Sequence, residues 1–330
     1  MASPTVYKWT DTDAPQIQRN NPASYQALFQ ACLIDGYGDQ LPPVDGLNKW
    51  TIPFSDATGF ILKQGGTQER KTCIKIFGFN SAGTYADVDC AGDFTDFNTP
   101  VDQWAGSGVN DHLPVGFANN TTNNIPWIIF ATERTIICQF GYNTQQTDSV
   151  LFDTNSTNTT LNNYHWYFGD YIPESPELNV NQMVTFTNST TTSSNTFNRC
   201  FTGTSVTTHV RRCAGNAGNL LGQFTIVPMS TRSINNSAFT IGVGSTDEFR
   251  PSYPNLVNGG LYLERVRLIS QRTILGEWSG ILYPLQSRPF PMNGSIYEID
   301  GTGEYAGETI YVFGAGDGLY FVRDGEWGVD

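Results

Sequence analysis

The N-terminal part of the chain changes its hydrophobic period once. Apolar and polar residues alternate over residues 6–10, which is typical of a β-strand. The apolar positions then recur every three or four residues, as on one face of a helix: Tyr25, Leu28, Phe29, Cys32 and Leu33. This spacing predicts one amphipathic helix over about residues 24–35. We expect Ser24 to cap its first turn and Gly36 to end it in a left-handed conformation.

The rest of the chain consists of short apolar runs separated by turns rich in Gly, Asn, Asp and Pro. Two continuous runs, 127–131 and 135–140, predict a hairpin that is covered on both faces. Residues 80–125 are expected to be irregular, and residues 144–163 and 186–198 to form surface loops. Further strands are expected at 50–54, 59–63, 72–79, 164–168, 199–210, 222–228, 238–243, 261–268, 274–283, 309–313 and 319–322.

Many short strands at this spacing predict a mainly β fold, built as an antiparallel sandwich or from barrel-like sheets, with a single N-terminal helix. No internal repeat and no linker interrupts the pattern. We therefore expect one continuous unit over residues 1–330. A subdivision near residues 171–200 is the alternative.

Composition makes the surface neutral and polar, because only 15% of the 330 residues are charged. The net charge of −13, from 18 Lys and Arg against 31 Asp and Glu, argues against a nucleic-acid-binding protein. The compact basic stretch of Arg211 and Arg212 near Arg199 is better explained as a solvated strand end than as a phosphate site.

The first residues have neither the basic nor the apolar segment of a signal peptide, and no run is long enough for a membrane span. The sequence thus predicts a protein assembled in a cytoplasm. Asn-x-Ser/Thr triplets are then expected to be chance products of an Asn- and Thr-rich chain. They include those at Asn119, Asn155, Asn158, Asn188 and Asn293.

The six cysteines include no C-x-x-C pair, so a structural zinc site is not expected. Cys32, Cys73 and Cys138 lie in apolar runs and are predicted to be buried free thiols. The fourth cysteine of the N-terminal half is Cys90. Cys200 and Cys213 have the spacing of a hairpin disulfide, which cytoplasmic folding disfavours.

The sequence predicts no catalytic, cofactor-binding or metal site. The three histidines, His112, His165 and His209, are assigned structural roles, since His165 lies among aromatic residues of an expected strand and His209 lies between Thr208 and Val210. No G-x-S-x-G elbow is present, and the Gly-rich residues 314–318 have the features of a hairpin turn and lack the Lys of a phosphate loop.

Clustered carboxylates leave one alternative open: Asp87, Asp89, Asp93 and Asp96. Such an oxygen-rich segment suits Ca²⁺, but the spacing does not fit the D-x-[DN]-x-[DN]-G loop. A solvated acidic loop is the favoured interpretation. Two carboxylates for glycoside hydrolysis stay open as well, because their separation depends on the fold.

Three blocks follow one another in the N-terminal part of the chain: residues 6–15, 31–38 and 50–54. In this order they resemble a family of tailed-bacteriophage virion proteins. Members open with a V-Y-x-S-T-D-x-x-A-P-like strand, followed by L-x-A-C-L-V-x-G-Y-G and G-W-x-x-P-F. The resemblance continues at 126–129 with 133–135, 168–170, 258–263, 280–285 with 288–289, and 301–303 with 306–309. Residues 80–125 and the Asn- and Thr-rich loops depart from the Gly- and Ala-rich versions of the family.

The resemblance implies a structural component of a virion and carries over no catalytic residue. We expect a non-enzymatic protein at the neck, tail or baseplate, assembled in the host cytoplasm. Its expected partners are other virion proteins and copies of itself, without nucleic acid. The alternatives are a capsid decoration protein and a receptor- or polysaccharide-binding module on the outside of the tail, which would contact a host-surface glycan. A tail-borne glycan hydrolase is the third interpretation.

Overall fold

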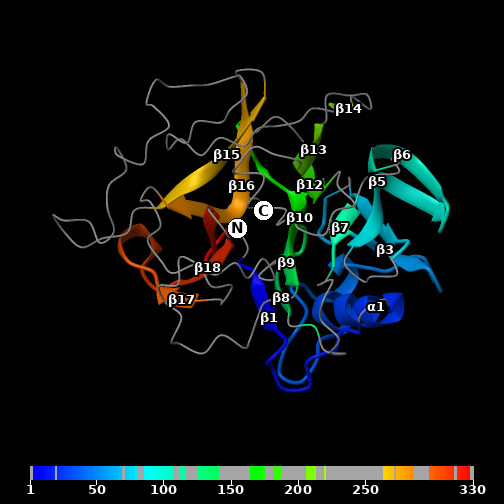
Figure 1. Ribbon diagram of the computed structural model, residues 1–330, viewed down its shortest axis with the longest axis horizontal. Helices are drawn as coiled ribbons and strands as arrows, with labels where there is room; N and C mark the ends of the chain where they lie inside the picture. Colours follow the sequence, from blue (N-terminus) through cyan, green and yellow to red (C-terminus); the bar gives the residue numbers. More distant parts are fainter. Residues whose placement is uncertain are drawn as a thin grey trace, which may run out of the picture.

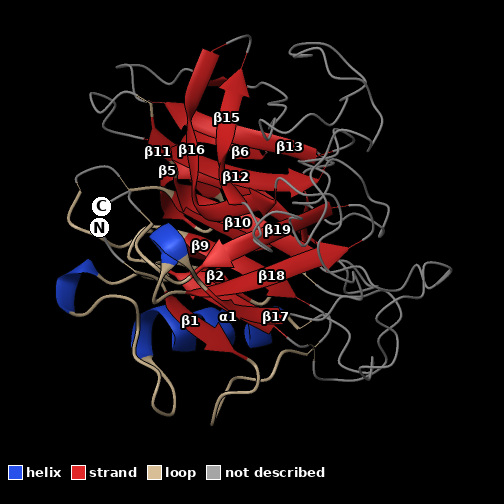
Figure 2. Cartoon of the chain, turned by 90° about the vertical axis from the view of Figure 1, so that its left-hand side faces the viewer, coloured by secondary structure: helices blue, strands red, loops and turns tan. Residues whose placement is uncertain are grey.

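The computed structural model describes most of the N-terminal half and the strands of the C-terminal half. The described residues are 3–18, 21–68, 71–79, 85–106, 112–115, 125, 127–140, 164–174, 181–187, 206–212, 219–220, 263–270, 273–284, 297–315 and 318–327. Within these ranges the protein is mainly β, with two antiparallel sheets that do not close into a barrel and one α-helix, α1 (Pro22–Gln30). The predicted fold class is confirmed, and its form is sandwich-like (Figures 1 and 2).

The larger sheet has 13 described strands, and its main path runs β1-β8-β9-β10-β12-β7-β5-β4-β3-β2. Strand β6 pairs with β5, and β13 joins β12 to β14. The bounds are β1 (Thr5–Lys8), β2 (Ser55–Asp56), β3 (Gly59–Lys63), β4 (Cys73–Phe77), β5 (Tyr85–Asp96), β6 (Thr99–Gly106), β7 (His112–Pro114), β8 (Trp127–Ala131), β9 (Ile136–Phe140), β10 (Tyr164–Asp170), β12 (Asn181–Thr187), β13 (Val206–Arg212) and β14 (Asn219–Leu220).

The smaller sheet has six described strands in the order β11-β16-β19-β18-β17, with β15 beside β16. Except for the short β11, they come from the C-terminal third of the chain. The bounds are β11 (Ile172–Pro173), β15 (Leu263–Ser270), β16 (Thr273–Pro284), β17 (Tyr297–Asp300), β18 (Thr309–Ala315) and β19 (Gly318–Arg323).

The hairpin of β8 and β9 is covered on both faces, as its continuous apolar runs predict. Alternate residues point to opposite faces of a strand, so Ile129 and Cys138 enter the core beneath α1. Phe130 and Ile137 enter a second core, which the smaller sheet covers. There the Phe130 ring meets Tyr311 edge-on at 5.0 Å between centroids. Figure 1 shows α1 on one side of β9 and β10 and the smaller sheet on the other.

Helix α1 starts earlier than predicted, and Ser24 is not its N-cap. Asn21 occupies that position, because Pro22, whose φ is already helical, takes the first turn. Ser24 instead donates its hydroxyl to the Asn21 carbonyl at 2.8 Å and accepts the N–H of Gln18 at 3.0 Å. The apolar face is confirmed, since all five predicted side chains are buried.

The predicted end of the helix is confirmed at Gly36. The chain continues from α1 through one π-helical turn, η1 (Ala31–Asp35), and the Gly36 N–H donates to the Ala31 carbonyl at 2.8 Å. Gly36 has a φ of +83°, and a Cβ there would lie 2.6 Å from the Gln40 carbonyl oxygen. Glycine therefore lets the chain double back under the helix.

The prediction that residues 80–125 are irregular is wrong, because β5, β6 and β7 lie there. Ala86, Val88 and Cys90 alternate into the core, while Asp87 and Asp89 take the opposite face. The high content of turn-forming residues conceals this period of two.

The strand predicted at 50–54 is also wrong. Pro53 lacks the N–H that a ladder needs, so Thr51 makes only an isolated bridge to Lys63, and β2 forms two residues after the proline. The strands predicted at 222–228 and 238–243 and the loop at 144–163 lie outside the described residues, as does nearly all of the loop at 186–198. The single unit and its alternative boundary stay predictions.

One ion pair joins the edges of the two sheets. Lys8 on β1 lies 2.6 Å from the Glu298 carboxylate on β17 and 5.2 Å from the centre of the Tyr311 ring. Partial burial alone would lower the pKa of Lys8, but the contacts with Glu298 and Tyr311 together outweigh it and raise that pKa. No helix in the described part of the chain is long and apolar enough to cross a membrane.

We predict that Glu298→Gln lowers the free energy of unfolding by about 0.2–1 kcal/mol at pH 7, because this part-exposed pair is screened by solvent. A Lys pKa raised by folding stabilises below its unfolded value, and this contribution is lost as the pH rises through the folded value. Urea unfolding should therefore show the difference at pH 7 and lose it as the pH rises above the usual Lys value of about 10.4 and through the raised value of the folded protein. Asp300→Asn on the same strand is the control, and a difference that persists at high pH contradicts the assignment.

Candidate functional site

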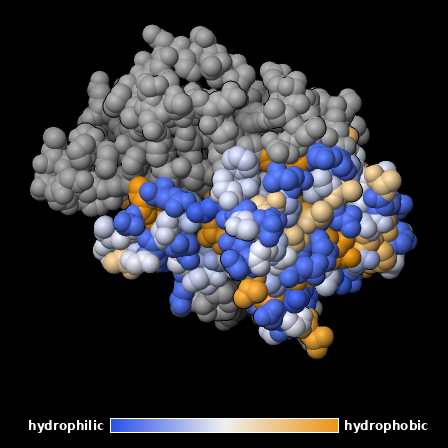
Figure 3. Space-filling view, turned by 90° about the horizontal axis from the view of Figure 1, so that it is seen from below, coloured by the Kyte–Doolittle hydropathy of each residue, from blue (hydrophilic) through white to orange (hydrophobic). Residues whose placement is uncertain are grey.

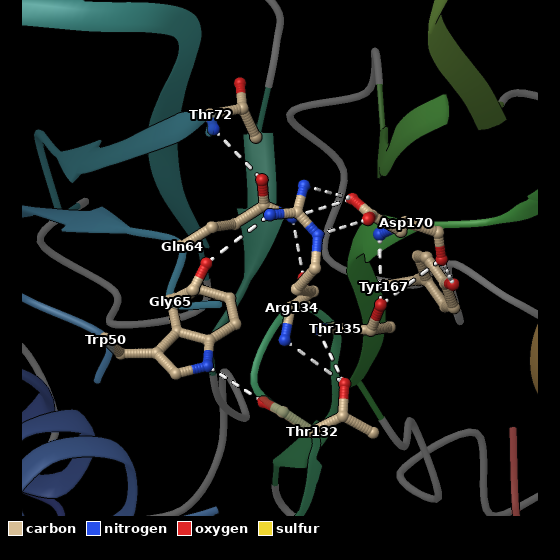
Figure 4. Close-up of polar contacts among 9 residues, drawn as sticks. All are labelled: Trp50, Gln64, Gly65, Thr72, Thr132, Arg134, Thr135, Tyr167 and Asp170. Atoms are coloured by element: carbon tan, nitrogen blue, oxygen red, sulfur yellow. Dashed lines mark hydrogen bonds and ion pairs between the residues drawn. The ribbon is translucent and has the colours of Figure 1, made fainter. Parts of the chain in front are cut away.

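Arg134 and Asp170 form the most deeply buried ion pair among the described residues (Figure 4). Their exposed fractions are 1% and 4%. The guanidinium donates through Nε to Asp170 Oδ2, and through Nη2 to Oδ1 at 3.2 Å. Two parallel bonds of this kind fix both the position and the orientation of the two groups.

Arg134 lies in the tight turn between β8 and β9. The Thr132 hydroxyl oxygen accepts the N–H of Arg134 at 3.2 Å and that of Thr135 at 3.0 Å. A threonine side chain closes turns in this way because its oxygen reaches the backbone two or three residues ahead. On the outer side of the turn, the Trp50 indole donates to the Thr132 carbonyl at 2.9 Å.

Asp170 ends β10, and the residue before it brings that strand close to the turn. Gly169 has a φ of +144°, and a Cβ there would lie 2.5 Å from both the Arg134 carbonyl oxygen and the Thr135 Cα. Any larger residue would push the two strands apart. The glycine thus sets the distance over which the ion pair forms.

Gln64, the residue after β3, contacts both members of the ion pair. The Gln64 amide donates to the Arg134 carbonyl at 2.6 Å and to Asp170 Oδ1 at 3.1 Å. Its own carbonyl oxygen accepts the Thr72 N–H at 2.9 Å. Arg134 Nη1 donates to the Gly65 carbonyl at 3.4 Å. One amide side chain therefore connects β3 and the start of β4 to both members of the pair.

The backbone of Asp170 is held as firmly as its carboxylate. The Thr135 hydroxyl accepts the Asp170 N–H at 3.0 Å and lies 3.2 Å from its carbonyl oxygen. The Tyr167 hydroxyl donates to the same carbonyl. Burial raises the pKa of Tyr167, so its hydroxyl stays a donor at neutral pH.

This arrangement positions strands and supplies no reactive group. A guanidinium does not lose its proton in proteins, and both carboxylate oxygens already accept hydrogen bonds. The charges neutralise each other in a place without solvent. Among the described residues, no group of three or more His, Cys, Asp and Glu could hold a metal ion.

The four clustered aspartates do not form an acidic loop, which corrects the favoured interpretation. All of them lie on one strand, β5: Asp87, Asp89, Asp93 and Asp96. Because a strand rises about 3.3 Å per residue, it spreads carboxylates that a loop would gather. Asp89 accepts the side-chain amide of Gln103 at 3.1 Å.

Two of these carboxylates are held by bonds that lower their pKa. Partial burial alone would raise the pKa of Asp93, but Lys63, at 2.9 Å from each oxygen, together with the Phe94 N–H and the Cys73 thiol outweighs it, and the pKa falls. The exposed Asp96 accepts the backbone N–H of Asn98 at 2.7 Å, which lowers its pKa.

All three histidines lie in strands, which was expected for His165 and His209 but not for His112. On β7, His112 contacts Asp87 Oδ1 through Nδ1 at 2.8 Å, and its ring lies 4.2 Å from that of Tyr85. Burial raises the pKa of Asp87, although the His112 contact opposes this. His165 belongs to β10 and His209 to β13.

Of the other residues singled out in the sequence, the structure describes some and not others. Arg211 and Arg212 end β13, and Arg199 lies outside the described residues. Residues 314–318 join β18 to β19 with Ala315 opposite Gly318, which confirms the predicted hairpin turn. The five Asn-x-Ser/Thr asparagines named above lie outside the described residues.

The buried free thiols are confirmed at Cys32, Cys73 and Cys138, and Cys90 is a fourth. Burial raises the pKa of Cys32 and of Cys138. Cys200 and Cys213 lie outside the described residues, so their disulfide stays a prediction.

Sequence reasoning from chemistry did not single out Arg134 or Asp170. One signal was present: Arg134 stands in a short turn between two mainly apolar segments, 127–131 and 135–140. A charge between buried strands needs a partner, since an unpaired buried charge is very costly. Comparison with models of known protein families and with curated proteins found no match for this chain.

We predict that Asp170→Asn lowers the free energy of unfolding by about 3–5 kcal/mol, because it leaves the Arg134 charge buried without its counter-charge. Asp93→Asn, which removes the carboxylate from the exposed pair with Lys63, should cost no more than about 1 kcal/mol. Thermal unfolding compares the two. The double variant Arg134→Met, Asp170→Leu should be more stable than Asp170→Asn, and equal losses in all three variants contradict the proposed geometry.

We also predict that iodoacetamide at pH 8 leaves Cys32 and Cys138 unmodified in the folded protein. Their thiols are shielded from the reagent, and burial disfavours the thiolate that reacts. The same thiols in denaturing urea are the control, and peptide mass spectrometry gives the extent of reaction. Equal labelling in the folded and unfolded protein contradicts the described core.

Proposed function

We propose that this protein is a non-enzymatic structural component of a tailed-phage virion, placed at the neck, tail or baseplate, where it packs against neighbouring subunits. One observation carries the proposal. The sequence blocks that resemble the virion family, though far apart along the chain, hydrogen-bond to one another.

The contacts run from block to block. In the first two blocks, the Tyr37 hydroxyl donates to Asp11 at 2.8 Å. The Trp127 indole of a later block reaches back to the Pro15 carbonyl at 3.0 Å. Arg134 and Asp170, from two further blocks, form the buried ion pair. The residues that carry the resemblance therefore connect distant segments of the chain.

This pattern favours a structural role over catalysis. Catalytic residues are expected in a concave site, where acidic and basic side chains have shifted pKa values. The residues that carry the resemblance instead bond to partners in the same chain. A surface with few charges also lowers the desolvation cost at contacts between subunits.

Electron microscopy of purified virions that carry a gold-labelled form of the protein tests the proposal. Label at the neck, tail or baseplate is the expected result. Label spread over the capsid favours the decoration alternative, and absence of the protein from purified virions contradicts a virion role. The control is a virion stock made without the tagged gene.

A binding assay separates the polysaccharide alternative. We expect the purified protein neither to bind an array of host-surface glycans nor to release reducing ends from host polysaccharide. Glycan binding without cleavage favours the receptor-binding module. Cleavage overturns the non-enzymatic assignment.

A further inference from the structure

The loop of residues 40–49, here named the leucine loop, carries two large apolar side chains in solvent. Leu41 is 71% exposed and Leu47 is 101% exposed. Only one other large apolar side chain, Val101, is exposed among the residues whose exposure the structure describes. Figure 3 shows a described surface that is mostly hydrophilic or neutral, from which a few apolar side chains stand out.

The backbone of the leucine loop is fastened to the core at both ends. At its start, Tyr37 and Gln40 exchange backbone hydrogen bonds of 3.0 and 2.8 Å, and the buried Tyr7 hydroxyl donates to the Leu41 carbonyl at 2.7 Å. At its end, the Asn48 carbonyl accepts the Gly66 N–H at 2.8 Å, and the Lys49 ammonium donates to the Ile34 carbonyl at 2.9 Å.

The middle of the loop is stiff as well, because Pro42 and Pro43 fix two successive φ angles. A fastened loop cannot fold its leucines back onto the protein. It also loses little conformational entropy when a partner covers it, which is the advantage of preorganised contacts. The loop thus presents two anchors whose burial has to come from another molecule.

The charges around the anchors indicate the chemistry of that molecule. Asp39 and Asp45 are exposed within two residues of Leu41 and Leu47, respectively. Lys49, the basic residue of the loop, is occupied by the Ile34 carbonyl. The apolar anchors therefore have an acidic rim, and complementarity calls for an apolar pocket with a basic rim.

A second copy of this chain does not fit that description. The chain has a net charge of −13. Several of its described basic side chains already pair with carboxylates: Lys8, Lys63, Arg134, Arg265 and Arg323. Two copies that met through the loop would also bring their aspartates together.

We propose that the leucine loop docks into an apolar, basic-rimmed pocket of a different protein of the same particle. The proposal rests on the virion role proposed above and names the surface that attaches the chain. Leu47 is the central anchor, Leu41 the second, and the two aspartates set orientation.

Photo-crosslinking inside assembled particles tests the proposal. Residue 47 is replaced by p-benzoylphenylalanine, and the exposed Ala57 is replaced in the same way as a matched control. The expected result is a crosslink from residue 47, and none from residue 57, to a different virion protein, in a segment whose apolar residues are flanked by Lys or Arg. A crosslink to a second copy of this chain overturns the assignment of the partner.

Incorporation of variants gives the second readout. Leu41→Ser with Leu47→Ser should reduce the amount of protein in purified particles by about ten-fold or more, since both anchors are lost. Its thermal unfolding midpoint should match that of the wild type. Wild-type incorporation of this variant overturns the docking proposal and leaves the virion role standing, whereas a wild-type chain absent from particles overturns both.

Discussion

The bidentate pair of Arg134 and Asp170 is the constraint on which the rest of the structure depends. Removing two charges from water costs several kcal/mol for each ion, and their attraction offsets this only when the remaining donors and acceptors are also satisfied. Gln64, Thr135 and Tyr167 supply those bonds. The turn between β8 and β9, the end of β3 and the end of β10 must therefore lie together. If any one of them moved away, Arg134 or Asp170 would lose hydrogen bonds that offset the cost of its burial.

The same pair lies where the chain passes from one sheet to the other. Asp170 is the last residue of β10 in the larger sheet, and Tyr171 enters the core between the sheets. Ile172 then begins β11 and pairs with Glu277 of the smaller sheet. The ion pair thus fixes the crossing point, and the two apolar cores lie on either side of the hairpin that carries Arg134.

Periodicity in the sequence was sufficient for the elements whose burial is regular. The five-residue apolar face of α1 and η1 and the apolar runs of β8 and β9 follow directly from spacing. Their side chains are buried away from water, whichever element packs against them. Ser24 was misassigned because Pro22 starts the helix first. Residues 85–96 were missed because four aspartates suggest a loop, although Ala86, Val88 and Cys90 alternate between them. The site itself was out of reach of local patterns, since Arg134 and Asp170 lie 36 residues apart and meet only through tertiary packing.

The order of strands in the larger sheet has a consequence for synthesis. Strand β7 lies between β5, which pairs with it through residues 85–87, and β12, which pairs with it only through His112 and Thr187 among the described residues. Residues 115–180 must leave the ribosome before β12 appears, which takes several seconds at roughly 5–20 residues per second. During that time the nascent chain carries an open strand edge, and such edges recruit other chains. The yield of folded protein therefore depends on how fast β12 pairs with β7, rather than on the free energy of unfolding of the complete sheet.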